Sequence, residues 1–221
     1  MHSKEARARG RNNEVVVLDF ETSGMSPLRG DRAIEIGAVR IVGDDIVERF
    51  QSLMNPGRRI DAFIENLTGI SNRMISQAPP AAEVMAAFSR FIGESPLVAH
   101  NAAFDGRFLE AELTRIGRRR QPGMICSMLV ARRLYPQAPN HKLATLVEYK
   151  GLPAADRFHR ALADAEMTAH LWLCMARELR STLGVNELPL ALWRRLATLK
   201  KERVARFLHE QAALAVSHTG P

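Results

Sequence analysis

Four carboxylates and one histidine have the types and spacing for a single chemistry. Asp19 and Glu21 lie two residues apart at the end of an apolar run, so on a strand their side chains would project from the same face. Asp105 and Asp164 each fall near the start of a predicted helix, and His159 precedes Asp164 by five residues. Each has an ordinary alternative, because a carboxylate in a first helical turn stabilises the helix dipole and a lone loop histidine is usually just exposed. The informative feature is therefore their combination.

Carboxylates gathered at one place would repel one another, and burial would raise their pKa values unless cations neutralised them. Oxygen ligands with open positions suit Mg²⁺ or Mn²⁺, which keep several waters and accept phosphate oxygens. Two such ions about 3.5–4 Å apart stabilise both the attacking and the leaving oxygen of phosphodiester hydrolysis. The attacking water also needs a base near neutrality, which is the range of histidine. The set predicts hydrolysis assisted by two Mg²⁺ or Mn²⁺ ions.

The elements that would bring these residues together follow from the apolar pattern. Short apolar runs predict buried strands, and helical periodicity between glycine and proline breakers predicts helices. The predicted strands cover residues 14–21, 33–42, 46–54, 96–100 and 124–125. The predicted helices cover residues 81–92, 101–116, 127–134, 143–149, 161–183 and 191–215.

A tight hairpin is predicted at Gly43-Asp44-Asp45, and after it helices and strands alternate. This order predicts an α/β fold, a mixed sheet with helices on both faces. In such sheets ligands bind beyond the carboxyl ends of the central strands. The runs Val15–Phe20 and Pro96–His100 would both end in that crevice.

Length, composition and charge fit a globular protein with a polyanionic partner. Hydrophobic residues make up 46% of the 221 residues, the net charge is +7, and the only two cysteines, Cys126 and Cys174, have no ligand-like spacing. The two cysteines are expected to be reduced thiols of a cytoplasmic protein. No apolar run approaches the roughly 18 residues of a membrane span. We predict a disordered basic arm at 1–13, a catalytic domain at 14–183 and an amphipathic helical extension at 184–221.

Four short motifs occur in order along the chain. They are Asp-Phe-Glu-Thr-Ser-Gly at 19–24, Leu-Thr-Gly-Ile at 67–70, His-Asn-Ala-Ala-Phe-Asp at 100–105 and His-Arg-Ala-Leu-Ala-Asp-Ala at 159–165. Together they closely resemble the motifs of the DEDD 3′→5′ exonucleases, histidine branch, a family that includes the proofreading ε subunit of bacterial DNA polymerase III and ribonuclease T. The resemblance covers about residues 14–181. It implies a ribonuclease-H-like fold with a mixed five-stranded sheet.

The resemblance also implies a role for each catalytic position. Asp19, Glu21 and Asp164 would hold the metal on the nucleophile side, with Asp19 bridging to the second ion. Asp105 would assist the second metal, and His159 would be the general base. The interval of five residues between His159 and Asp164 matches the histidine branch.

Substrate contacts are implied in the same way. The segment from Thr22 to Gly24 would let backbone groups approach the terminal nucleotide. Leu67 and Ile70 resemble an apolar wedge between the last bases, although core packing is an equally good explanation of both. The remaining expected contacts are Thr68, to the terminal sugar or phosphate, and His100 and Phe104, as a wall for the last nucleotide. Glu35 also matches a recurrent strand of the family, but a structural role on the strand beside Asp19 explains it better.

Several functions share these motifs. The leading hypothesis is removal of 5′-mononucleotides from single-stranded or frayed 3′ ends of DNA, in proofreading or repair. The alternatives are an RNA-trimming nuclease like ribonuclease T, a polymerase-associated nucleic-acid-binding subunit, and an endonuclease of the same fold. A DNA polymerase subunit or a second copy of the chain are the expected protein partners. The basic extension predicts a helix docked on the core, a track for nucleic acid, or a partner-binding face.

Overall fold

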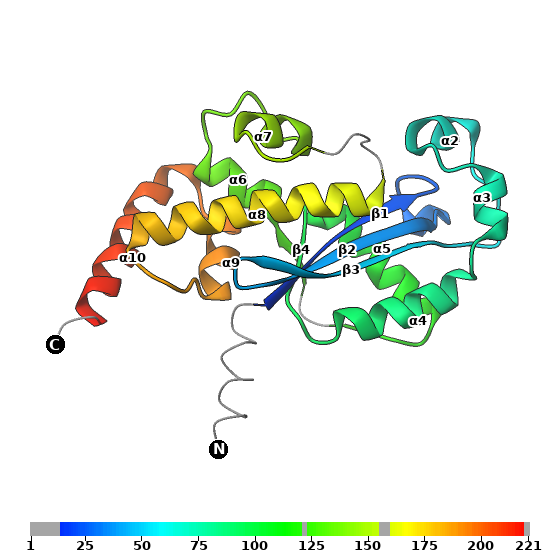
Figure 1. Cartoon of the computed structure of the whole chain (residues 1–221), viewed down its shortest axis with the longest axis horizontal. Helices are drawn as coiled ribbons and strands as arrows, with labels where there is room; N and C mark the ends of the chain where they lie inside the picture. The colour runs from blue at the N-terminus through cyan, green and yellow to red at the C-terminus, as the bar shows by residue number, and fades with distance from the viewer. Residues whose placement is uncertain (1–13, 121–122, 155–159, 219–221) are drawn as a thin grey trace, which may run out of the picture.

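Five strands form one mixed sheet at the centre of the molecule (Figure 1). The computed structural model describes residues 14–120, 123–154 and 160–218. The strand order is β3-β2-β1-β4-β5, in which β1 pairs with β2 and β2 with β3 antiparallel, while β1–β4 and β4–β5 are parallel. The strands are β1 Glu14–Thr22, β2 Ala33–Val42, β3 Asp45–Leu53, β4 Leu97–Ala99 and β5 Ile125–Cys126. The mixed five-stranded sheet and the hairpin between β2 and β3 are confirmed.

Helices cover both faces of this sheet. The helices are η1 Pro27–Arg29, α2 Ala62–Thr68, α3 Asn72–Gln77, α4 Ala81–Ile92, α5 Ala102–Arg115, α6 Ser127–Leu134, α7 Leu143–Tyr149, α8 Ala161–Leu183, α9 Leu190–Thr198, η2 Lys201–Arg203 and α10 Val204–His218. The bounds predicted for α4, α6, α7 and α8 agree with these to the residue. No helix in the described parts of the chain is long and apolar enough to cross a membrane.

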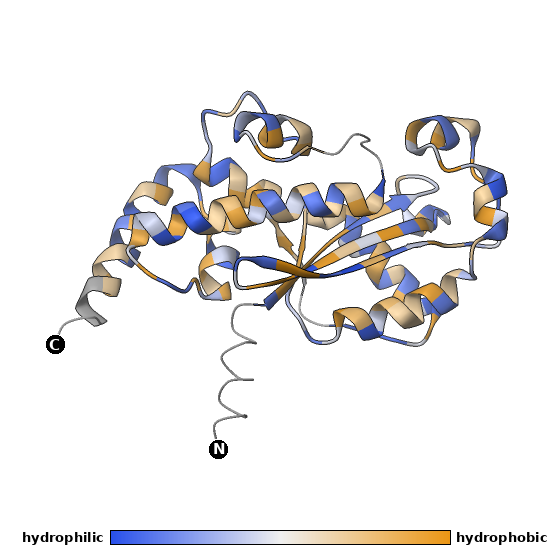
Figure 2. Ribbon diagram, viewed as in Figure 1, coloured by the Kyte–Doolittle hydropathy of each residue, from blue (hydrophilic) through white to orange (hydrophobic). Residues whose placement is uncertain are grey.

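Alternation along β1 separates the two cores. Val15 and Val17 belong to the cluster beneath α8, α6 and α9, whereas Val16, Leu18 and Phe20 pack with α4 and α5 on the opposite face. Figure 2 shows the central strands largely in hydrophobic colours, with polar and apolar stretches interleaved along α8. Because side chains alternate along a strand, the residues that follow Val17 at intervals of two also face α8.

Two parts of the fold differ from the expectation. The short helices α2 and α3 were not predicted, although Gly69 ends α2 in the left-handed conformation and the Ser71 hydroxyl caps α3 by accepting from Met74 N at 3.2 Å. The single helix predicted for 191–215 is broken, since Leu199 and Lys200 adopt extended backbone between α9 and α10. The imperfect apolar period of that segment reflects this break.

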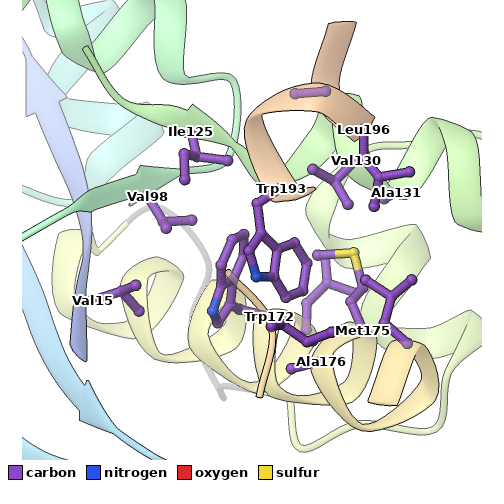
Figure 3. Close-up of a cluster of buried hydrophobic side chains, with 14 of the residues drawn as sticks. Val15, Val98, Ile125, Val130, Ala131, Trp172, Met175, Ala176, Trp193 and Leu196 are labelled. Carbon is purple, nitrogen blue, oxygen red and sulfur yellow. The ribbon is translucent and has the colours of Figure 1, made fainter. Parts of the chain in front are cut away.

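The apolar face of α9 is docked on the α8 side of the sheet. Trp193 stacks on Trp172 of α8 with ring centroids 3.8 Å apart, and Leu196 is fully buried. Figure 3 shows both indoles among side chains of β1, β4, β5, α6 and α8. The docked-helix expectation for the extension is thus met by α9, which shares a core with the preceding domain.

Candidate active site

Three of the predicted carboxylates meet at the carboxyl end of β1. Asp19, Glu21 and Asp164 each offer a carboxylate oxygen, and these oxygens lie within 4.8 Å of one another. Asp19 and Glu21 continue the Val15–Val17 side of β1, which is the face covered by α8, and Asp164 lies in the first turn of α8. Figure 1 shows α8 beginning above this end of the sheet. Clustered oxygen donors of this kind suit a hard divalent cation.

A glycine permits α8 to begin so close to the sheet. Gly37 pairs with Asp19 across the β1–β2 ladder. A Cβ at position 37 would lie 2.1 Å from the backbone nitrogen of Leu162, so any side chain would push the start of α8 away. The close approach brings Asp164 within reach of the carboxylates on β1.

Glu35 anchors the same end of α8. Its carboxylate is fully buried and accepts from Arg160 Nη2 at 2.8 Å, Arg160 Nε at 3.1 Å and the N–H of Ala161 at 3.1 Å. Gln51 Nε2 donates a further bond of 2.9 Å. The structural role expected for Glu35 is therefore observed. The ion pair with Arg160 was not anticipated, and an acidic residue inside an apolar strand was the only sequence signal for it.

Asp105 lies beside the three carboxylates but is held by the backbone. It is 2% exposed, and its Oδ1 accepts from the N–H of Phe20 at 3.1 Å. It is not a member of the group whose oxygens converge within 4.8 Å. This arrangement fits the expected assisting position better than direct membership of the three-carboxylate cluster.

Burial and mutual repulsion oppose ionisation of these carboxylates. Burial raises the pKa of Glu21 to about 8, with smaller contributions from the charges of Asp164, Glu35 and Asp105. Burial also raises the pKa of Asp105 to about 7, even though the Phe20 N–H favours its charged form. The pKa of Asp19 is raised well above its usual value by burial and then by the neighbouring carboxylates, Asp105 first. A cation among these oxygens would remove the penalty.

His159, expected as the general base, lies outside the described residues. The chain is described again from Arg160, the N-cap residue of α8. Arg160 donates to the Glu35 carboxylate, and this contact holds the first end of α8 in place.

Both ring nitrogens of His100 have partners within the protein. Nε2 lies 2.9 Å from the carbonyl oxygen of His141, which can only accept, so Nε2 carries a proton. In the neutral ring Nδ1 then accepts from the Ser127 hydroxyl at 2.9 Å. Burial lowers the pKa of His100 to about 4, which keeps the ring neutral near pH 7. The two ring nitrogens of His100 therefore link the end of β4 by hydrogen bonds to α6 and to the segment before α7.

The Leu-Thr-Gly-Ile motif divides into one exposed and two buried side chains. Leu67 is 44% exposed, whereas Ile70 is fully buried with Ile34, Ile60 and Ile75. The Thr68 hydroxyl is also buried, donating to the carbonyl of Ile64 at 2.9 Å and accepting from the N–H of Ile70 at 3.1 Å. Ile70 is therefore a core residue, which is the packing explanation that the sequence left open for it. Leu67 is exposed and remains a candidate for contact with the substrate.

The other expected substrate residues lie near the carboxylates. Phe104 is partly buried and contacts the Phe108 ring, with centroids 5.1 Å apart. The Thr22 hydroxyl is used internally and donates to the carbonyl of Gly24 at 2.6 Å. Asn101, the N-cap residue of α5, has a positive φ of 75° and makes no side-chain capping bond.

The fold and the carboxylate cluster define a ribonuclease-H-like α/β protein with an acidic cluster suited to a divalent cation. A family model described as "Exonuclease" matches residues 16–172. The chain belongs to this family, the DEDD 3′→5′ exonucleases, whose members are metal-dependent nucleases.

Relatives by sequence include PolC-type DNA polymerases III. The protein of Caldanaerobacter subterraneus subsp. tengcongensis is 36% identical over 190 residues, which cover 85% of this chain and 13% of that protein. The protein of Bacillus subtilis is 38% identical over 166 residues, or 74% of this chain and 11% of that protein. The chain thus spans about one eighth of the length of these relatives.

Solved structures share the fold. Exonuclease X in complex with 5′ overhanging duplex DNA is 26% identical, with a TM-score of 0.64 over 83% of this chain and 99% of that chain. The nuclease domain of 3′hExo, a DEDDh family member bound to rAMP, has a TM-score of 0.66 over 80% of this chain and 96% of that chain. The latter is 19% identical and supports the fold alone.

Proposed function

We propose that this chain is a 3′→5′ exonuclease that releases 5′-mononucleotides from DNA ends with the help of two Mg²⁺ or Mn²⁺ ions. The convergence of Asp19, Glu21 and Asp164 within 4.8 Å is the observation that carries the proposal. Two divalent cations would supply stabilisation of the attacking and leaving oxygens of the scissile phosphodiester.

Each residue has a proposed task. Asp19, Glu21 and Asp164 hold the ions, and Asp105 assists from the edge of the cluster. His159 accepts the proton of the attacking water, a task that requires a neutral imidazole. The interval of five residues between His159 and Asp164, which resembles the histidine branch of the family, supports this assignment.

The last nucleotides of the substrate are proposed to lie between α2 and α5. Leu67 is, with Phe63, one of two exposed large apolar side chains of α2, and Phe104 offers a ring beside the carboxylates for stacking. Base–aromatic stacking contributes about 1–3 kcal/mol. Thr22, Thr68 and His100 use their polar side-chain atoms internally, so we propose that they shape the crevice.

DNA is the proposed substrate, in proofreading or repair. The PolC-type relatives are DNA polymerases, and Exonuclease X has been solved with duplex DNA. A polymerase is accordingly the proposed protein partner. RNA trimming is the second candidate, because 3′hExo binds rAMP in the same fold.

A labelled-strand assay tests the proposal. Matched 5′-labelled deoxy and ribo oligomers are incubated with Mg²⁺, Mn²⁺ or excess chelator, with Asp19→Asn as the inactive control. We expect stepwise shortening of the deoxy strand that stops in chelator and in the variant. Full activity in chelator would exclude the metal mechanism, faster loss of the ribo strand would favour RNA, and cleavage of a closed single-stranded circle would exclude an exonuclease.

A further inference from the structure

Docking of α9 leaves a basic surface at the end of the sheet away from the carboxylates. The buried residues of α9 are Leu192, Trp193, Leu196 and Ala197, so its arginines face solvent. Residues 190–206 contain six basic side chains and one acidic side chain, Glu202. We define the α9 basic surface as the exposed cations Arg132, Arg194, Arg195, Lys200, Lys201 and Arg203.

The surface is assembled from two elements that are held together. Arg133 Nε donates to the carbonyl oxygen of Leu199 at 2.9 Å, which fixes the end of α9 against α6. Arg132 precedes Arg133 on α6, so α6 and the turn that carries Lys200 both contribute to the surface. Among the described residues, none of the six cations of this surface forms an ion pair with a carboxylate. Their charge is available to an external anion.

The distance to the candidate active site decides which part of a substrate this surface meets. Val15, near the start of β1, lines a small cavity together with Trp193 of α9. Glu21 lies six residues further along β1, which at about 3.3 Å per residue is roughly 20 Å. A nucleic-acid strand advances about 3.4 Å per nucleotide in B-DNA and further when it is extended, so at most about six nucleotides separate the two places.

We propose that the α9 basic surface binds the backbone phosphates of the DNA substrate several nucleotides upstream of its 3′ end. The inference rests on the proposed function, because that function supplies a polyanion whose end lies at the carboxylates. It adds a second contact site, which strengthens binding of long substrates and leaves the chemistry at the 3′ end unchanged. Neutralising phosphates releases counterions, so each contact contributes to the salt dependence of binding.

The test compares Arg194→Gln/Arg195→Gln with a control of equal charge, Arg90→Gln/Arg119→Gln, whose exposed arginines lie on α4 and beyond α5. Binding of a 20-nucleotide strand is measured in chelator between 50 and 200 mM salt, together with hydrolysis of a trinucleotide in Mg²⁺. We expect the first variant to lower the salt slope by about 0.7 per lost contact, up to about 1.4. Trinucleotide hydrolysis should stay at the wild-type rate, and the control should keep the wild-type slope.

An unchanged slope in the first variant, or an equal fall in the control, would overturn the proposal. Binding in chelator does not require hydrolysis, so a wild type that binds with the expected slope but cuts nothing would refute only the proposed function. Circular-dichroism melting of both variants checks that α9 remains docked. If Arg194→Gln/Arg195→Gln melts early, Lys200→Gln/Lys201→Gln replaces it, since these side chains lie beyond the end of α9.

Discussion

Glu35 and Arg160, 125 residues apart in the chain, form a bidentate ion pair at the start of α8. Glu35 is fully buried, whereas the Arg160 side chain is 31% exposed. The same carboxylate accepts the N–H of Ala161, so a residue of β2 caps a helix that carries a proposed metal ligand. The cluster of carboxylates therefore depends on a contact outside itself.

Glu35→Gln should weaken metal binding as well as stability. The amide group of the variant places a hydrogen-bond donor against the guanidinium of Arg160. The start of α8, which carries Asp164, is then no longer held in place. Removing one partner of a buried pair costs about 3–5 kcal/mol, and the exposure of Arg160 reduces that figure here. Calorimetric titration with Mn²⁺ should show lower affinity, and kcat should fall more than KM rises. The matched control is Glu210→Gln, which breaks the exposed pair with Arg206. Unchanged Mn²⁺ affinity in Glu35→Gln would limit Glu35 to stability.

The metal-free protein should lose stability as pH rises from about 6.5 to 8.5. Burial raises the pKa values of Glu21 to about 8 and Asp105 to about 7, so the folded state binds more protons than the unfolded state in this range. His100 acts in the opposite direction but only between about 4 and 6.5, because its pKa is lowered to about 4. Melting temperatures in chelator should therefore fall across the window.

Mg²⁺ should reverse that loss, since it binds the ionised carboxylates of the folded state. The increase in melting temperature on adding Mg²⁺ should be larger at pH 8 than at pH 6.5. Glu21→Gln removes one of the titrating groups and should flatten the metal-free pH dependence. A metal-free melting temperature that rises through the window would contradict this assignment of the charges.

Leu67→Ala and Ile70→Ala should separate substrate contact from packing. Leu67 is exposed, so its removal should raise KM for a frayed 3′ end while the melting temperature stays nearly constant. Ile70 is fully buried, and truncating it should cost about 2–5 kcal/mol of stability. Steady-state kinetics and chemical denaturation of both variants provide the comparison. If Leu67→Ala loses stability and keeps KM, Leu67 is a packing residue.

His159→Ala should slow hydrolysis by about 10²–10⁴-fold, the usual contribution of a general base. The wild-type rate should rise with pH through the apparent pKa of the base and then level off, because only the neutral imidazole accepts the proton. Single-turnover rates measured across pH should lose that rise in the variant, while Mn²⁺ and oligonucleotide affinities are retained. Loss of binding in proportion to rate would indicate that His159 positions the substrate instead.

The amino-acid sequence by itself was sufficient for most of the local elements and for proposing the catalytic set, although it missed α2, α3 and the break after α9. Alternation along β1 placed Asp19 and Glu21 on one face, Pro80 and Gly93 bounded α4, and Gly184 ended α8. These features depend on periods of two and 3.6 residues, which short stretches of chain record directly. The order of the four motifs was sufficient for the family, because it needs only residue types and intervals.

Tertiary structure decided which of those side chains are free to act. Ile70 and Leu67 have the same apolar character in the sequence, yet one is fully buried and the other exposed. The partners of His100 and Glu35 come from distant elements, so no local period reports them. The same holds for the break after α9 and for the stacking of Trp193 on Trp172, which leaves the arginines of α9 facing outward. Long-range packing selects among local possibilities that short stretches of sequence do not distinguish.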